Sequence, residues 1–225
     1  CDLSPELLRE NDIELFPLFI NKGDESFRDG VDIQPADIFA HVAAGGALCS
    51  TAAVPVGVFH DRFAELAKEY DAVFHVNIGS GFSASHQNAV LAAEDLPNVY
   101  VIDSRNLSTG QGHVVLEACR LAKTATDPEE MYRQLNAFAP TVDASFLLDR
   151  LDYMKKGGRC SAVTLLGANL LRLRPCIEVR DGKMGVGKKY RGSFDKCVCE
   201  YITDKIGNRS DLELRRVFIT HSGVS

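Results

Sequence analysis

The sequence predicts an α/β protein in which strands alternate with helices. Apolar residues recur in a single stripe at helical spacing: they are Phe59, Phe63, Leu66, Ala67 and Tyr70. Short apolar runs at 72–78 and 99–103 are typical of buried strands, with a helical segment between them. Strands separated by helices of this length indicate βαβ units and a mainly parallel sheet.

The first elements are predicted from capping residues and proline. Ser4 and Pro5 are typical of an N-cap and a first helical turn, and that helix is expected to end near Glu10. The apolar run at 13–20 predicts a strand, which Pro17 places at a sheet edge or a bulge. Further helices are expected at 84–96, at 112–123 and from Pro128 onward.

After about residue 141 the pattern changes, because a hairpin joins the helices. Asp181-Gly182 separates two runs that can pair, which predicts a β-hairpin within 175–192. The other expected elements are a strand from Ala144, a helix over 150–159 ended by Gly157-Gly158, helices at 164–173 and 194–206, and a strand at 216–220. We therefore expect two domains, a first α/β domain over 1–140 and a second over 141–225.

The composition is ordinary for a globular protein, with 45% hydrophobic residues. No run approaches the roughly 18 apolar residues of a membrane span, and the amino terminus does not resemble a signal peptide. A cytoplasmic protein without integral membrane insertion is the expectation. The seven cysteines are scattered, which favours reduced thiols. Cys197 and Cys199 are close, but their spacing suits neither a metal site nor a disulfide.

Charge is distributed unevenly along the chain. Residues 1–150 hold 10 Lys and Arg against 23 Asp and Glu, whereas residues 151–225 hold 15 against 8. So acidic a first part argues against nucleic-acid binding, which needs a basic face. The basic last third is either a solvated surface or a docking patch for an acidic partner.

A candidate anion site lies in the stretch NIGSGFSASHQNAV, residues 77–90. A strand that ends in Gly-Ser-Gly and turns into a helix presents free backbone N–H groups and hydroxyls at one point. Ser83 is expected to be the N-cap, with Ala84 and Ser85 offering N–H groups. Ser83 could equally do no more than cap its helix, so phosphate, carboxylate and no ligand all remain open. The phosphate-loop and dinucleotide-loop patterns are absent from this stretch.

An alternative is a serine hydrolase of lipid or ester substrates that uses Ser83. Residues 81–85 are one glycine short of the G-x-S-x-G nucleophile elbow. Ser83, Asp103 and a later histidine, His113 or His221, occur in the chain order of α/β-hydrolases, an order that also arises by chance. His86, one turn after Ser83, is expected to face solvent or cover the sheet. A purely structural module is a third alternative.

Several stretches together resemble the DegV family of bacterial fatty-acid-binding proteins. They are CDLSPELL, GDESFRDGVDIQPADIF, CSTAAVPVGVF, NIGSGFSASHQNAVLAAE, VYVIDSRNLSTGQGHVVLEA and YMKKGGRCSAVTLLGANLLRLRPCIEVRDGKM. The resemblance covers nearly the whole chain. It departs from the family at 83–86, where S-G-T-Y is Ser-Ala-Ser-His. The expected fold is therefore the two-domain DegV-like (EDD) α/β fold, with a parallel-sheet first domain and the ligand in the cleft between domains.

The resemblance implies a non-catalytic carrier of one long-chain fatty acid, without cofactor or metal. Thr51 and Ser83, with the N–H of Ala84, would bind the carboxylate. The tail would lie in an apolar tunnel, one wall of which we expect within 164–171, at Leu165, Leu166 and Leu170. A separate DAK-type fatty-acid kinase would phosphorylate the bound acid to an acyl phosphate.

The resemblance also gives the basic run at 155–191 a role. This run holds ten Lys and Arg against only Glu178 and Asp181. Arg191 is expected to dock the kinase, together with Lys188 and Lys189. Family members begin with a strand ending in D-S and continue to a histidine followed by G-P-G, so this chain is expected to be a fragment whose second domain is incomplete.

Overall fold

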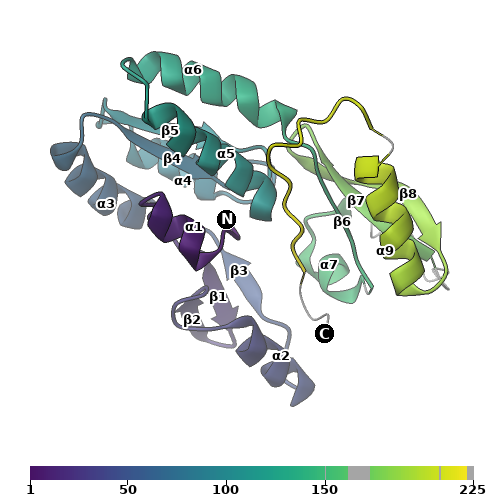
Figure 1. Cartoon of the computed structure of the whole chain (residues 1–225). Helices are drawn as coiled ribbons and strands as arrows, with labels where there is room; N and C mark the ends of the chain where they lie inside the picture. The colour runs from purple at the N-terminus through teal and green to yellow at the C-terminus, as the bar shows by residue number, and fades with distance from the viewer. Residues whose placement is uncertain (150, 162–172, 208, 222–225) are drawn as a thin grey trace.

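A computed structural model describes residues 1–149, 151–161, 173–207 and 209–221 (Figure 1). Its centre is a pair of parallel strands, β4 (Val73–Asn77) and β5 (Val99–Asp103), paired in register from Val73 opposite Val99. Both strands are almost wholly apolar, as strands covered on both faces are. Helices lie on each side of the pair, which gives a three-layer unit.

Alternation along the two strands divides the core into two clusters. Val73, Val99 and Val101 face α3 (Val56–Glu69) and α4 (Ser85–Ala92). Phe74, Val76, Tyr100 and Ile102 face α5 (Ser108–Ala122) and α6 (Pro128–Phe138). The predicted stripe begins with Phe59 and Phe63, which are almost fully buried in the first cluster. The βαβ prediction is thus confirmed for these elements.

A small antiparallel sheet precedes this unit. Its strands are β1 (Phe19–Lys22), β2 (Glu25–Arg28) and β3 (Ser50–Ala52), in the order β2-β1-β3. Helix α2 (Pro35–Ala43) lies beside it, and α1 (Pro5–Glu10) begins at the predicted N-cap, where Ser4 Oγ accepts from Leu7 N at 3.3 Å. The prediction of a mainly parallel sheet is therefore wrong in part, since only β4 and β5 pair in parallel among the described strands.

The elements after residue 140 build another antiparallel sheet, the third sheet of the described residues and hereafter the second antiparallel sheet. Strands β6 (Ala144–Leu147), β7 (Leu173–Arg180) and β8 (Lys183–Arg191) lie in that order. One face packs against α7 (Asp152–Gly157) and the segment after it, where Met154 and Cys160 meet Ile177. The other face packs against α9 (Phe194–Ile202) through Cys176, Tyr190 and Cys197. Two further short helical segments flank these elements among the described residues: the 3₁₀ helix η1 (Ala139–Thr141) before β6, and the π-helix η2 (Thr203–Gly207) after α9.

Two signals of the second half are confirmed. Asp181 and Gly182 form the β7–β8 turn with φ of 50° and 70°, the left-handed pair that a tight hairpin requires. Gly158 ends α7 with φ of 70°.

Two expected strands are wrong, and one expected helix cannot be compared. Residues 13–18 are not a strand, because pairing begins only at Phe19, two residues after Pro17, which lacks an N–H. Residues 216–220 have no strand structure either. The helix expected at 164–173 falls outside the described residues except for Leu173, which begins β7.

Contacts between residues 1–140 and the elements that follow include three near the small sheet and the β4–α4 loop. The β7–β8 turn lies against the loop after β4, so closely that a Cβ atom on Gly81 would clash with the Gly182 carbonyl oxygen. The rings of Phe39 on α2 and Tyr153 on α7 meet edge to face at 6.2 Å. Arg159, after α7, reaches Thr51 on β3. Among the described helices, none has the length and apolar character needed to cross a membrane.

Candidate functional site

The candidate site begins where β4 ends and the chain turns into α4. The β4–α4 and β5–α5 loops lie side by side, because Gly79 N donates to Asn106 O at 2.8 Å. A Cβ atom on Gly79 would come within 2.9 Å of Asn106 N. The first glycine of the stretch therefore permits backbone packing, and the second, Gly81, permits the contact with the β7–β8 turn. Both glycines are therefore required for packing within the protein, whether or not a ligand binds here.

Ser83 lies just before α4 and caps it from one residue further back than predicted. The helix begins at Ser85, so Ala84 is the N-cap residue, and it is exposed. The Ser83 Oγ atom accepts from Ser85 N at 3.2 Å and lies 3.0 Å from Ser85 Oγ. The hydroxyl therefore lies at the amino-terminal end of α4, the end of a helix that favours anions.

Thr51 lies on β3, and two hydrogen bonds hold the segment after it against α4. Val54 N donates to Ser85 Oγ at 3.3 Å, and Asn88 Nδ2 donates to Val54 O at 2.8 Å. Thr51 is exposed, so its hydroxyl is accessible. The structure thus brings the Thr51 segment to the helix end that carries Ser83 and Ala84.

Arg159 is a member of this neighbourhood that sequence reasoning missed. Its Nη2 donates to Thr51 Oγ1 at 3.4 Å, and its Nη1 donates to the Gly157 carbonyl at 2.7 Å. In the sequence, Arg159 belongs to the basic run at 155–191 and has no further distinguishing feature. No local signal marks it, because its contact with Thr51 spans 108 positions of the chain. A guanidinium beside the hydroxyl adds a positive charge at this point.

The buried side chain of Asn77, at the end of β4, holds the start of α4 in place. Asn77, 4% exposed, donates from Nδ2 to Ser85 O at 3.2 Å and lies 2.9 Å from His75 Nε2. The rings of Phe16, Phe59 and Phe63 surround His75 at 5.1 to 5.2 Å. Burial lowers the pKa of His75 to about 3, so its imidazole is neutral at pH 7.

The residues of the alternative hydrolase do not come together. Asp103 is occupied by Ser80, whose Oγ and N donate to it at 2.6 and 3.1 Å, and by Arg105 N at 2.8 Å. His113 lies on α5 with its ring 4.8 Å from that of Phe218. Neither Asp103 nor a histidine forms a hydrogen bond with Ser83 in the part of the chain that the structure describes. His86 Nδ1 is buried and has no partner among the described residues.

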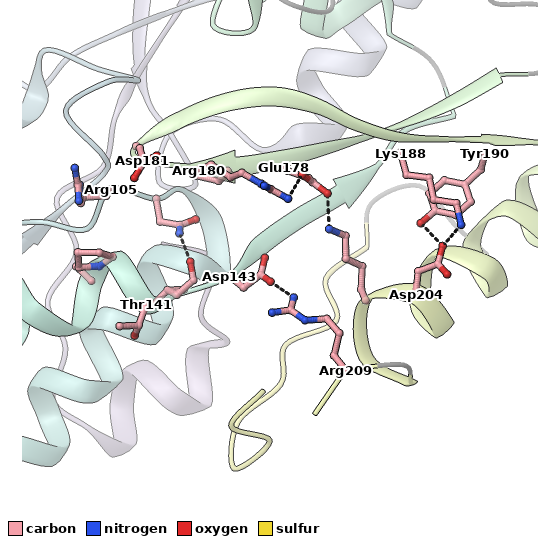
Figure 2. A pocket seen from close by; sticks show the side chains of 17 residues that line it. Arg105, Thr141, Asp143, Glu178, Arg180, Asp181, Lys188, Tyr190, Asp204 and Arg209 are labelled. Carbon is pink, nitrogen blue, oxygen red and sulfur yellow. Dashed lines mark hydrogen bonds and ion pairs between the residues drawn. The ribbon is translucent and has the colours of Figure 1, made fainter. Parts of the chain in front are cut away.

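The three leucines expected at the tunnel wall, Leu165, Leu166 and Leu170, lie outside the described residues. A hollow of about 740 Å³ opens elsewhere, between the β5–α5 loop, the η1–β6 segment and the second antiparallel sheet (Figure 2). Charged side chains dominate its lining, and Thr51 and Ser83 do not contribute to it. An alkyl chain would gain little there, because burying it would desolvate these charges.

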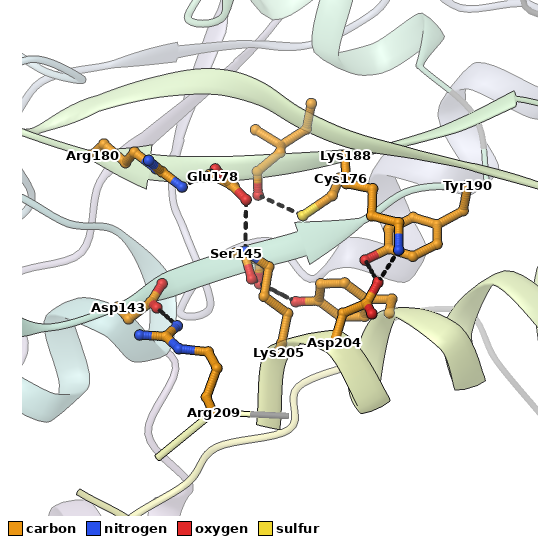
Figure 3. A network of polar contacts seen from close by, with 12 residues as sticks. Asp143, Ser145, Cys176, Glu178, Arg180, Lys188, Tyr190, Asp204, Lys205 and Arg209 are labelled. Atoms are coloured by element: carbon orange, nitrogen blue, oxygen red, sulfur yellow. Dashed lines mark hydrogen bonds and ion pairs between the residues drawn. The ribbon is translucent and has the colours of Figure 1, made fainter. Parts of the chain in front are cut away.

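Ion pairs fill much of this hollow (Figure 3). Glu178 accepts from Lys205 at 2.6 Å and from Arg180 at 2.8 Å, and the Lys205 ammonium lowers the pKa of this carboxyl. Asp204 accepts from Lys188 at 2.5 Å and from Tyr190 Oη at 2.9 Å, and Arg209 pairs with Asp143. These ion pairs account for the charged lining of the hollow without a ligand.

The three basic residues expected to dock a partner do not share one face of β8. Two residues of β8, Gly187 and Lys188, lie opposite the single residue Cys176 of β7, which is a β-bulge. Lys188 pairs with Asp204 on the α9 side, the face that Tyr190 also occupies, so alternation places Lys189 and Arg191 on the other face. Both are exposed.

The comparisons with known proteins identify the family. The model described as "Uncharacterised protein, DegV family COG1307" matches residues 1–225. The chain belongs to the DegV family. A DegV domain-containing protein of Clostridium acetobutylicum is 33% identical over 218 residues, which is 95% of this chain and 78% of the relative. One of Caldanaerobacter subterraneus is 32% identical over 224 residues, or 98% and 79%.

Solved DegV structures match the fold. The fatty-acid-binding DegV family protein of Thermus thermophilus superposes with a TM-score of 0.79 at 26% identity, over 92% of this chain and 75% of that one. The stearic-acid-binding protein of Eubacterium ventriosum gives 0.78 at 26%, over 92% and 76%. DegV of Bacillus subtilis, described as a fatty acid binding protein, gives 0.77 at 27%, over 90% and 74%. The α/β fold is therefore that of the fatty-acid-binding DegV structures.

Proposed function

We propose that this DegV protein binds one long-chain fatty acid, whose carboxylate is held by the hydroxyls of Thr51 and Ser83 and the N–H of Ala84. The observation that carries the proposal is the match in fold, at more than 25% identity, to DegV proteins described as fatty-acid-binding. The convergence of the Thr51 segment with the start of α4 supports the assignment of the head-group site.

The energetics suit a site built from hydroxyls. Each buried methylene contributes about 0.8 kcal/mol, so a chain of ~15 methylenes gives roughly 12 kcal/mol before the cost of ordering it. The carboxylate then needs orientation more than strong attraction. The Arg159 guanidinium, which already donates to Thr51, supplies a charge that favours the ionised form. The tail wall at Leu165, Leu166 and Leu170 stays part of the proposal.

Native mass spectrometry of protein purified from a bacterial host, followed by lipid extraction, tests the proposal. We expect an adduct with the mass of a fatty acid of about 14 to 18 carbons, the length that ~15 buried methylenes imply. Thr51→Ala and Ser83→Ala should each weaken binding by about 1–3 kcal/mol, because a buried hydrogen bond is lost. Thr124→Ala, which removes an exposed hydroxyl, is the matched control. Clean apo protein after incubation with palmitate would contradict the proposal.

We further propose that the protein presents its fatty acid to a DAK-type kinase for acyl-phosphate formation, docking through Arg191 and Lys189. Both residues are exposed on one face of β8, whereas Lys188 is occupied by Asp204. Lys188, on the other face and paired with Asp204, is therefore not included among the docking residues.

Arg191→Glu should abolish phosphorylation of the bound acid and leave fatty-acid affinity unchanged. Like charges would oppose docking to an acidic partner, while the carboxylate site lies elsewhere. Arg133→Glu on α6, where the side chain is 73% exposed, is the charge-reversal control and should be phosphorylated normally. Unchanged phosphorylation of the Arg191 variant would exclude this docking surface.

A further inference from the structure

Ser85 is a buried hydroxyl within the candidate site, and its own role is not explained by the carboxylate contacts. It is 1% exposed and is the first residue of α4. Its Oγ accepts from Val54 N at 3.3 Å and lies 3.0 Å from Ser83 Oγ. Ser85 therefore connects the Thr51 segment to Ser83.

The hydroxyl proton of Ser85 has a single available hydrogen-bond acceptor among the described residues. A buried donor needs an acceptor, because leaving it unpaired costs about 1–3 kcal/mol. Val54 N is itself a donor and cannot accept the proton. Among the described residues, Ser83 Oγ is the only acceptor within hydrogen-bond reach of Ser85 Oγ. Ser85 therefore donates to Ser83.

Ser83 consequently accepts twice from the same residue. Its Oγ takes one hydrogen bond from Ser85 N at 3.2 Å and another from Ser85 Oγ at 3.0 Å. A serine hydroxyl has two acceptor positions and one proton. With both acceptor positions filled, the proton of Ser83 is the part left to point outward.

The backbone that carries Ser85 is itself fixed from below. Asn77 Nδ2 holds the Ser85 carbonyl at 3.2 Å, and its second proton is directed at His75 Nε2, 2.9 Å away. His75 is neutral, so Nε2 can accept that proton. Both amide protons are used, and the turn cannot shift without breaking one of these bonds.

We propose that Ser85 is a positioning residue that makes Ser83 an obligatory hydrogen-bond donor to the ligand. The proposal rests on the proposed function and deepens it, because it specifies what head group the site selects. A carboxylate only accepts hydrogen bonds, so it matches a fixed donor. A fatty alcohol has a proton of its own and needs an acceptor, which Ser83 does not offer.

The test is the ratio of palmitate affinity to hexadecanol affinity in the full chain, measured by displacement of a fluorescent fatty acid. Ser85→Ala should lower this ratio about three- to tenfold, the worth of one oriented hydrogen bond. Ser85→Thr keeps the hydroxyl and should restore the parent ratio. A loss of packing alone would weaken both ligands equally and leave the ratio unchanged.

An unchanged ratio in a folded Ser85→Ala protein would overturn the proposal and leave fatty-acid binding standing. If the parent chain itself bound no palmitate, the proposed function would fall and this inference with it. Thermal melting checks the fold of each variant. Should Ser85→Ala not fold, Ser85→Cys replaces it, since a thiol of similar size is only a weak donor and predicts the same lowered ratio.

Discussion

At the candidate site, the role of a side chain follows from its hydrogen-bond partners more than from its residue type. Ser83 could be identified from the sequence, because a hydroxyl at the junction of a strand and a helix is a local pattern. Arg159 could not, since its contact with Thr51 spans 108 positions and depends on how α7 meets β3. From the sequence, Ser85 was expected only to offer a backbone N–H. Its burial and its hydrogen bond from Val54 N determine to which atom its hydroxyl donates.

His75 leads to a prediction about pH. Its pKa is lowered to about 3 in the folded protein, whereas an unfolded histidine titrates near 6.5. The unfolded chain therefore binds a proton that the folded one does not, so the free energy of unfolding falls as the pH drops below about 6.5. The limiting slope is about 1.4 kcal/mol per pH unit for this group.

Urea unfolding of the parent and of His75→Phe at pH 7, 6 and 5 measures this effect. The variant should lose less stability across this range, because phenylalanine fits among the aromatic rings and does not titrate. His60→Gln, which replaces an exposed histidine, is the control variant. Equal slopes in the parent and in His75→Phe would show that the folded protein does protonate His75.

Whole elements were predicted well where a local signal defines them. The β7–β8 hairpin follows from Asp181-Gly182, and the stripe that begins at Phe59 became α3. The strand expected at 13–20 reduced to its last two residues, because strand pairing is a long-range property that apolar character alone does not ensure. Strand alternation puts Lys188 and Arg191, three positions apart, on opposite faces of β8. The ion pair of Lys188 with Asp204 spans 16 positions and gave no local signal. A partner-binding surface therefore cannot be read from a basic run alone.

On the scale of the whole molecule, the contact between Gly81 and Gly182 holds one unit against the other. Gly81→Val should force the β7–β8 turn away, because the added side chain would overlap the Gly182 carbonyl. We expect a larger radius of gyration by small-angle scattering and faster amide exchange at 181–183. Gly185→Val in β8, where a Cβ meets nothing within 4 Å, is the matched control and should change neither. Unaltered scattering for Gly81→Val would mean that the other contacts suffice.

The same contact places the turn of β7–β8 on the loop that carries Ser83, and β8 also carries Lys189 and Arg191. A protein that binds β8 and displaces its turn changes the surroundings of the head group. Free energies of binding are reciprocal, so the factor by which such a protein alters the retention of the fatty acid is also the factor by which the fatty acid alters the affinity of that protein. Under the proposed function, the fatty-acid-loaded and empty forms of this protein then differ in their affinity for the proposed kinase, which would distinguish them before any phosphate is transferred.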